Sequence, residues 1–165
     1  MHKRRYLFAV SAGVLVLGLF AWAQGRKPGL WEVNTNMTWQ QSPFPADSPA
    51  AAAMAGRART TQVCVTQEQI DKFGAPPPQT QRDCQVANVA LRPDGMSADL
   101  VCSGHFAGKG TIEAKFLDSG HSESRIHFTG SLQMGPQSKP IEWTIESSSS
   151  FKGSDCGSVK PIETK

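Results

Sequence analysis

Cysteine, histidine, serine and carboxylate side chains are the groups of this chain that could do chemistry. The four cysteines, Cys64, Cys84, Cys102 and Cys156, are spread along the sequence. Zinc sites need closely spaced ligand pairs, which this spacing does not supply. An even number of cysteines in an exported chain is typical of a disulfide framework. We therefore expect two disulfides and no metal site.

Hairpin symmetry favours one of the three possible cysteine pairings. Residues 84–102 read as two strands around a Pro93-Asp94-Gly95 turn, with a cysteine at each end. Residues opposite each other in such a hairpin come within disulfide reach. This favours Cys84–Cys102 and leaves Cys64–Cys156, and each closure stabilises by about 3 to 5 kcal/mol in the chain-entropy model.

The histidines and carboxylates form no catalytic pattern. His105, His121 and His127 lie in separate segments, and we expect solvated surface positions for them rather than metal ligation. Glu142 and Glu146 share the wet face of one predicted strand. Paired carboxylates can act as general acid and base, but soluble sheet faces carry such pairs routinely.

Nucleophile and phosphate motifs are missing from the sequence. The serines lack a G-x-S-x-G elbow, and Gly108-Lys109-Gly110 is too short for a phosphate loop. No catalytic residue, metal or cofactor is therefore predicted. A hydrolase is the least favoured alternative, and it would need a cleft where a histidine meets a carboxylate or serine.

Large apolar side chains give the candidate binding residues. Residues 29–39 alternate cleanly, which predicts a half-buried strand. Its tryptophans could line a site for an apolar ligand, although ordinary core packing is the favoured reading. The candidate lining across the chain is Trp31, Met37, Trp39, Phe116, Phe128 and Trp143.

The elements that must position these residues are mostly strands. The patterns predict strands at residues 29–39, 60–65, 84–102 (two), 111–117, 122–134 and 140–151, and short helices at residues 50–55 and 67–73. Thr66 to Gln69 resembles a capping box, with Gly74 as the helix stop. The predicted fold is mainly β, a single antiparallel meander sheet, curved or partly closed, with one or two short helices and two disulfides.

Several segments are predicted to interrupt these strands. Residues 40–59 form a long excursion, which we expect to be a flexible loop and a candidate cover for a site. The glycine-rich residues 104–110 predict a flexible turn or bulge, and Gly130 predicts a bulge with a shift of facing. The serines at positions 147–150 are expected at the exposed end of the last strand.

The first 23 residues have the three-part pattern of a signal peptide. Lys3, Arg4 and Arg5 precede an uncharged run that ends in Ala21-Trp22-Ala23. This predicts a Sec-type leader cleaved after Ala23, with an uncleaved membrane anchor as the alternative. The mature chain, residues 24–165, would form a single disulfide-bridged domain in the periplasm or outside the cell, with no membrane span.

The net charge argues against nucleic-acid binding. Of the 17 Lys and Arg residues, three lie in the leader, so 14 basic residues face 14 acidic ones in the mature chain. A neutral chain with no basic cluster lacks the electrostatic footprint for nucleic acid.

Motifs spread over most of the mature chain resemble one family. They are Lys27-Pro28-Gly29-Leu30-Trp31-Glu32-Val33, Cys64-Val65-Thr66-Gln67-Glu68, Cys84, Cys102-Ser103-Gly104 and Gly153-Ser154-Asp155-Cys156. Together they resemble the bacterial exported family called domain of unknown function 3617. The resemblance implies an exported, cysteine-bridged domain with no assigned activity and no catalytic residues to carry over.

The function predicted from the sequence is binding. The first hypothesis is a small non-catalytic domain for an apolar small molecule or a segment of a partner protein. The alternative is a structural or interaction module of the cell envelope that acts through its surface. The expected partners are thus an apolar small molecule or an envelope protein.

Overall fold

The computed structural model describes residues 25–54, 58–80 and 83–162. The predicted leader lies outside these residues. The strands are β1 (Gly29–Gln41), β2 (Arg59–Val65), β3 (Cys84–Arg92), β4 (Gly95–Cys102), β5 (Phe106–Phe116), β6 (His121–Met134) and β7 (Gln137–Gly153). The helices are α1 (Pro49–Met54) and α2 (Gln67–Phe73).

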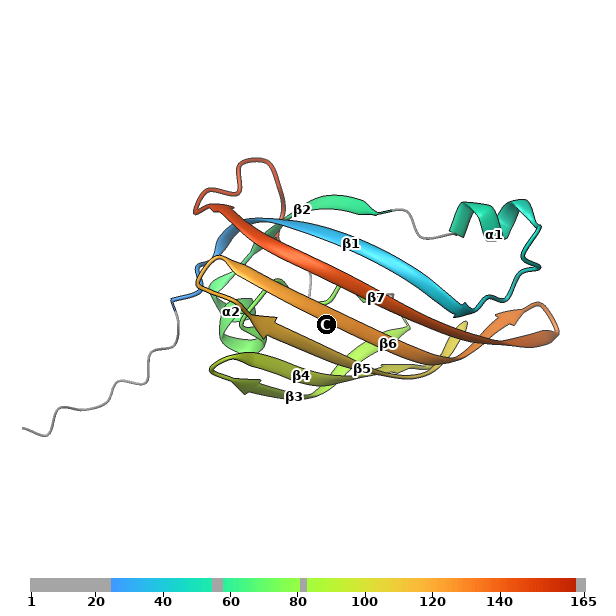
Figure 1. The fold of residues 1–165 in the computed structure, drawn as a ribbon. Coiled ribbons are helices and arrows are strands. Elements are labelled where there is room, and N and C mark those ends of the chain that lie inside the picture. The colour runs from blue at the N-terminus through green and yellow to red at the C-terminus, as the bar shows by residue number, and fades with distance from the viewer. Residues whose placement is uncertain (1–24, 55–57, 81–82, 163–165) are drawn as a thin grey trace, which may run out of the picture.

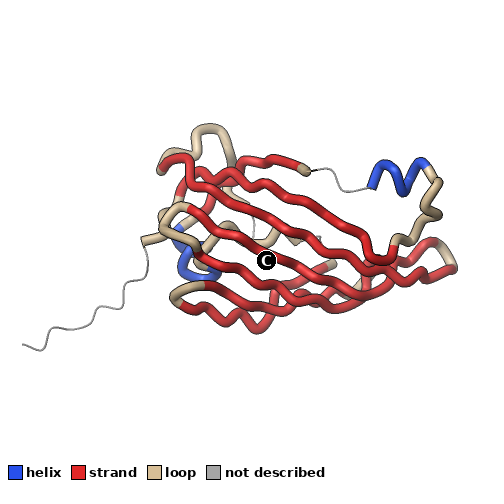
Figure 2. Tube along the Cα trace, in the orientation of Figure 1, coloured by secondary structure: helices blue, strands red, loops and turns tan. Residues whose placement is uncertain are grey.

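The seven strands form one antiparallel sheet in the order β2-β1-β7-β6-β5-β4-β3. The sheet is strongly curved but does not close, because β2 and β3 are its two edges and do not pair with each other (Figure 1). Figure 2 shows the strands as one bent layer, with α2 near one end and α1 near the other. The predicted fold class, a curved antiparallel sheet with two short helices and two disulfides, is confirmed.

Buried side chains on the concave face form two separate clusters. The large core cluster consists of Phe73, Ala75, Met96, Ala98, Leu100, Cys102, Ile112, Ala114, Phe116, Phe128, Leu132 and Ile141. The small core cluster consists of Trp31, Val63, Val65 and Ile70. Strand alternation places these residues on one side of the sheet, since successive side chains point to opposite faces.

Helix α2 closes one end of the concave face, and its caps agree with the prediction. The Thr66 side chain accepts a hydrogen bond from the Gln69 backbone N–H, and the Gln69 side chain accepts one from the Thr66 backbone N–H. Gly74 adopts the left-handed conformation, with φ of 69°, that ends the helix. Ile70 and Phe73 then point into the two core clusters.

Both predicted disulfides are present. Cys84 and Cys102 are direct cross-strand partners in the β3–β4 hairpin and are bonded to each other. Cys64 on β2 is bonded to Cys156, which joins the sheet edge to the C-terminal segment across 92 residues of sequence. No free cysteine remains among the described residues.

The turn or bulge predicted for the glycine-rich residues 104–110 is confined to their start, since Gly104 and His105 lie in the turn between β4 and β5. Strand β5 begins at Phe106 and runs through Gly108 and Gly110. Gly108 pairs with Gly130 of β6, and a Cβ at Gly108 would lie 2.8 Å from the Phe128 ring. The glycines therefore give the Phe128 ring room against the sheet, where it stacks on Trp143 at a centroid separation of 5.0 Å.

The predicted bulge at Gly130 is wrong. The pairing of β6 with β5 and β7 is continuous through this residue, and Phe128 and Leu132 on either side belong to the same core cluster. No change of facing occurs, because positions 128, 130 and 132 share one parity.

The sequence had suggested that the serines at positions 147–150 form the exposed end of the last strand, and this prediction is wrong. Strand β7 continues to Gly153, and Ser147 and Ser149 point to the concave side of the sheet. Ser148, between them, pairs with Asn34 and Glu123 on the other side. Polar residues in the middle of a concave face raise the question of what they contact.

Candidate functional site

A cavity of about 430 Å³ lies on the concave face between the two core clusters. It is lined by β-strand residues Val33, Thr35, Met37, Arg59, Thr61, Val63, Met96, Ile112, Ala114, Ser122, Ser124, Ile126, Ile145, Ser147 and Ser149, together with Ala53, Ala75 to Gln79 and Ile162. Six of the seven strands contribute. Its volume lies within the range of about 300 to 1,000 Å³ that is usual for small-molecule pockets.

Matched cross-strand pairs form the floor of this cavity. Ser124 pairs with Ser147, and Ser122 pairs with Ser149. The next pair along the same two strands is Ile126 with Ile145. The floor thus changes from small hydroxyl side chains to apolar ones, and the small serines leave space that large side chains would fill.

The cavity is covered by segments outside the sheet. The proline-rich connector that follows α2 lies on one side, and Ile162 of the C-terminal segment lies beside it. Gln69 donates a hydrogen bond of 2.6 Å from Nε2 to the Ile162 carbonyl oxygen. The backbones of Cys64 and Pro161 also pair in an isolated β-bridge. With the Cys64–Cys156 disulfide, these contacts fix the C-terminal segment over the cavity.

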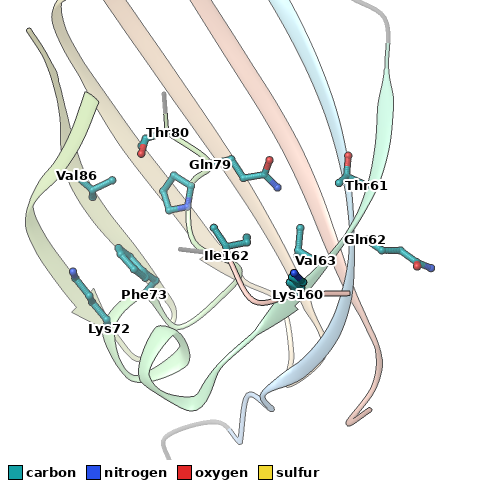
Figure 3. A pocket seen from close by; sticks show the side chains of 11 residues that line it. Thr61, Gln62, Val63, Lys72, Phe73, Gln79, Thr80, Val86, Lys160 and Ile162 are labelled. Carbon is teal, nitrogen blue, oxygen red and sulfur yellow. The ribbon is translucent and has the colours of Figure 1, made fainter. Parts of the chain in front are cut away.

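A second hollow, the seam pocket, lies between the two unpaired sheet edges (Figure 3). Its volume is about 350 Å³. Its lining is Thr61, Gln62 and Val63 of β2, Lys72 and Phe73 of α2, Pro78, Gln79, Thr80, Val86 of β3, Lys160 and Ile162. Thr61, Val63, Pro78, Gln79 and Ile162 line both hollows, so the seam pocket adjoins the cavity.

Of the six predicted lining residues, Met37 lines the cavity. Trp31 and Phe128 are buried in the core with exposed fractions of 1% and 0%, and Trp39 and Trp143 pack against the large core cluster. Phe116 is also a core residue, and the Arg26 guanidinium lies 3.7 Å from its ring centroid. Apart from Met37, the predicted residues lie in or against the two core clusters and are not among the residues that line the cavity.

The lining residues that the sequence prediction did not include are the small and polar ones of the same strand parity. Ser122 and Ser124 precede Ile126 at two-residue spacing, and Ser147 and Ser149 follow Ile145 in the same way. Extending the alternation through these serines would have placed them on the concave face. The C-terminal residues Lys160 and Ile162 gave no such signal, because the disulfide and the Gln69 hydrogen bond place them.

The excursion between β1 and β2 reaches the cavity. Helix α1 lies beyond the end of β1 in Figure 1, and Ala53 of this helix and Arg59 at the start of β2 line the cavity. The proposed cover function of this segment stays a prediction. Within the described residues, no helix is long and apolar enough to cross a membrane.

The histidines lie outside the cavity lining. His127, on the convex face, places Nδ1 3.3 Å from Thr144 Oγ1 and Nε2 3.4 Å from Glu142 Oε1. Thr144, His127 and Glu142 are thus arranged like the nucleophile, base and acid of a catalytic triad. Thr144 is only 5% exposed, however, so its hydroxyl group is not accessible to a substrate. His121 contacts Asp118 in the β5–β6 turn at 2.8 Å.

Metal-binding clusters were searched over residues 25–54, 58–80 and 83–162. In these ranges no three His, Cys, Asp or Glu side chains gather closely enough to hold a metal ion. The linings of the two hollows offer apolar surface, hydroxyl groups, amides and three basic side chains, Arg59 at the cavity and Lys72 and Lys160 at the seam pocket.

Comparison with known proteins gives one match. No curated protein and no solved structure matches this chain. The family described as "Protein of unknown function (DUF3617)" matches residues 26–156, a range that includes all seven strands and both disulfides. The resemblance noted from the cysteine frame and the opening motif is confirmed, and the chain belongs to the DUF3617 family.

Proposed function

We propose that this is an exported binding protein that holds an apolar small molecule in the cavity between its two core clusters. Export rests on the leader-like residues 1–23, and the two disulfides support it because disulfides persist in oxidising compartments. None of the three histidines is among the residues that line the two hollows.

One observation carries the binding proposal. The concave face divides into two buried clusters, and the space between them remains a cavity with apolar side chains around small ones. Protein interiors are normally packed closely, so an open cavity of this size on a face lined by six strands supports a binding function. Binding an apolar molecule would remove the exposed lining from water, which is favourable by about 25 cal/mol per Å².

The hydroxyl groups in the floor add a polar element to the site. Within the part of the chain that the structure describes, the Ser124 and Ser147 side chains form no hydrogen bond with other protein groups. They are therefore available to a ligand or to water. A mostly apolar pocket with a few polar groups is typical of small-molecule sites.

The unpaired edges support a second candidate function, that of an envelope interaction module. Strands β2 and β3 each have one side without a neighbouring strand in the sheet. Such edges can accept a strand from a partner protein. The C-terminal segment contacts β2 at Cys64, and helix α2 contacts β3, so each edge is covered in part.

Titration with the neutral fluorescent probe N-phenyl-1-naphthylamine tests the first function. We expect saturable binding with increased emission for the purified, disulfide-bonded protein. Ser147→Trp, which would fill the cavity from its floor, should abolish this binding. Ser148→Trp places the same side chain on the opposite face of β7 and should leave binding unchanged. No saturable binding by the folded wild-type protein would reject the cavity function and favour the edge-mediated one.

A further inference from the structure

The charges around the two hollows are all of one sign. Arg59 lines the cavity, and Lys72 and Lys160 line the seam pocket. No Asp or Glu is among the described residues that line either hollow. Because the mature chain carries equal numbers of acidic and basic residues, this one-sided distribution is a local property and does not reflect the overall composition.

Lys72 and Lys160 come from different elements and lie around the same apolar surface. Lys72 is in the last turn of α2, and its Nζ lies 5.1 Å from the centroid of the Phe73 ring. Lys160 is in the C-terminal segment that the Cys64–Cys156 disulfide fixes. In the view of Figure 3, Phe73 and Ile162 lie between the two lysines.

Neither lysine has an anionic partner among the described residues. The ion pairs in this part of the chain join His121 with Asp118, His127 with Glu142, and Lys152 with Glu32. Both ammonium groups are exposed and available to an external anion. The side chains of Gln79 and Thr80, which also line the seam pocket, add hydrogen-bonding groups.

We infer that the ligand is a single-chain anionic amphiphile, whose charged head lies in the seam pocket between Lys72 and Lys160 and whose apolar chain lies in the adjoining cavity. This inference rests on the proposed function. It adds the charge of the ligand and the orientation in which the ligand binds. The shared wall residues Val63 and Ile162 provide a continuous apolar path from the lysines to the cavity. A long-chain carboxylate and an alkyl phosphate share the required chemistry.

The test is displacement of bound N-phenyl-1-naphthylamine by three ligands with the same twelve-carbon chain: dodecanoate, dodecyl phosphate and dodecan-1-ol. We expect at least one of the two anions to bind about tenfold more tightly than the alcohol, and the tighter anion identifies the head-group class. Raising the salt concentration from 0.05 to about 0.5 M should weaken the anions and leave the alcohol unchanged, because salt screens exposed charges.

Charge-removing variants locate the head group. Lys72→Gln and Lys160→Gln should each weaken anion binding about threefold, and about tenfold together, without changing the affinity for dodecan-1-ol. Lys109→Gln is the matched control, because this exposed lysine of β5 lines neither hollow, and it should have no effect. All these variants should keep the wild-type affinity for the neutral probe, which shows that the cavity is intact.

Two results would overturn the inference while leaving the proposed function standing. One is equal binding of the alcohol and both anions by a protein that binds the neutral probe. The other is loss of anion binding in Arg59→Gln but not in the Lys72 and Lys160 variants, which would move the head group to the β2 end of the cavity. Failure of the neutral probe to bind would instead reject the cavity function itself.

Discussion

Ser124 on β6 and Ser147 on β7 are direct cross-strand partners, and both side chains line the cavity between the two core clusters. A pair of large apolar residues at this point would join the two clusters into one continuous core. Two serines leave the space open and supply hydroxyl groups there. The open space therefore follows from side-chain size at a few strand positions, and the connector after α2 and the C-terminal segment cover it.

The first prediction concerns these two hydroxyl groups. The double variant Ser124→Val, Ser147→Val should bind N-phenyl-1-naphthylamine about threefold more tightly than the wild type. Valine adds apolar lining at both positions, and each buried CH₂ contributes up to about 0.8 kcal/mol. Fluorescence titration measures the change, with Ser148→Val as the control on the opposite face. Weaker binding at unchanged stability would show that the hydroxyl groups themselves hold the probe.

The second prediction concerns the paired glycines beneath the Phe128 ring. Gly130→Ala should lower the free energy of unfolding by about 1 to 3 kcal/mol, because overpacking forces neighbouring groups to move. The new Cβ would lie 2.9 Å from both the Gly108 Cα and the Phe128 ring. Gly153→Ala is the control, since nothing lies within 4 Å of a Cβ there. Urea unfolding of the two variants compares them, and an equal effect would contradict the packing argument.

The third prediction separates the two disulfides. Replacing Cys64 and Cys156 by alanine should cost about 4 to 5 kcal/mol of stability, whereas replacing Cys84 and Cys102 should cost about 3 kcal/mol, because the longer loop restricts the unfolded chain more. Denaturant unfolding under oxidising conditions gives both values.

The Cys64–Cys156 variant should also weaken anion binding, because this disulfide fixes the segment that carries Lys160. The Cys84–Cys102 variant serves as its control and should keep its anion affinity under conditions where it is folded. A reversed order of binding effects would contradict the role assigned to the C-terminal segment.

The fourth prediction is an acid-range effect in the β5–β6 turn. The Gly120 backbone N–H, which donates a hydrogen bond of 2.6 Å to Asp118 Oδ1, and the His121 ring hold the pKa of Asp118 below its usual value. Because the pKa is lowered in the folded state, the stabilisation is present above the unfolded value of about 4 and is lost as the pH falls through the folded pKa. The group is fully exposed, so the effect is confined to the turn.

NMR titration of the Asp118 carboxyl checks this prediction. In His121→Ala the pKa of Asp118 should rise, but it should stay below its usual value because the Gly120 hydrogen bond is the larger cause. An unchanged pKa in this variant would show that the ring has no influence on the carboxylate.

The sequence predicted those parts of the fold that depend on local pattern. The alternation of β1, the capping box at Thr66 and Gln69, and the symmetric hairpin between Cys84 and Cys102 are all readable within about twenty residues. Each rests on a short-range rule: strand parity, helix capping or cross-strand distance. The parity rule also predicted which apolar residues of the strands lie on the buried, concave face.

The predictions that were wrong or incomplete concern features that depend on contacts between segments far apart in the sequence. Gly108 continues a strand because Gly130 and the Phe128 ring occupy the space that its side chain would need. The cavity could not be located from large apolar residues, because most of these fill the core and the opening lies where small residues meet. The position of Lys160 depends on a disulfide to a strand 92 residues away from Cys156.

The last prediction concerns Gln69, which joins helix α2 to the C-terminal segment. Its Oε1 accepts a hydrogen bond from the Thr66 N–H, and its Nε2 donates one to the Ile162 carbonyl oxygen. Gln69→Glu keeps the first contact and replaces the second donor by a carboxylate oxygen, which repels the carbonyl. We expect faster hydrogen exchange in residues 159–162 and weaker anion binding, at a cost of about 1 to 3 kcal/mol in stability. Thr66→Ala removes the helix cap alone and should cost about 1 kcal/mol without affecting that segment. Equal exchange in both variants would show that Gln69 does not hold the segment over the cavity.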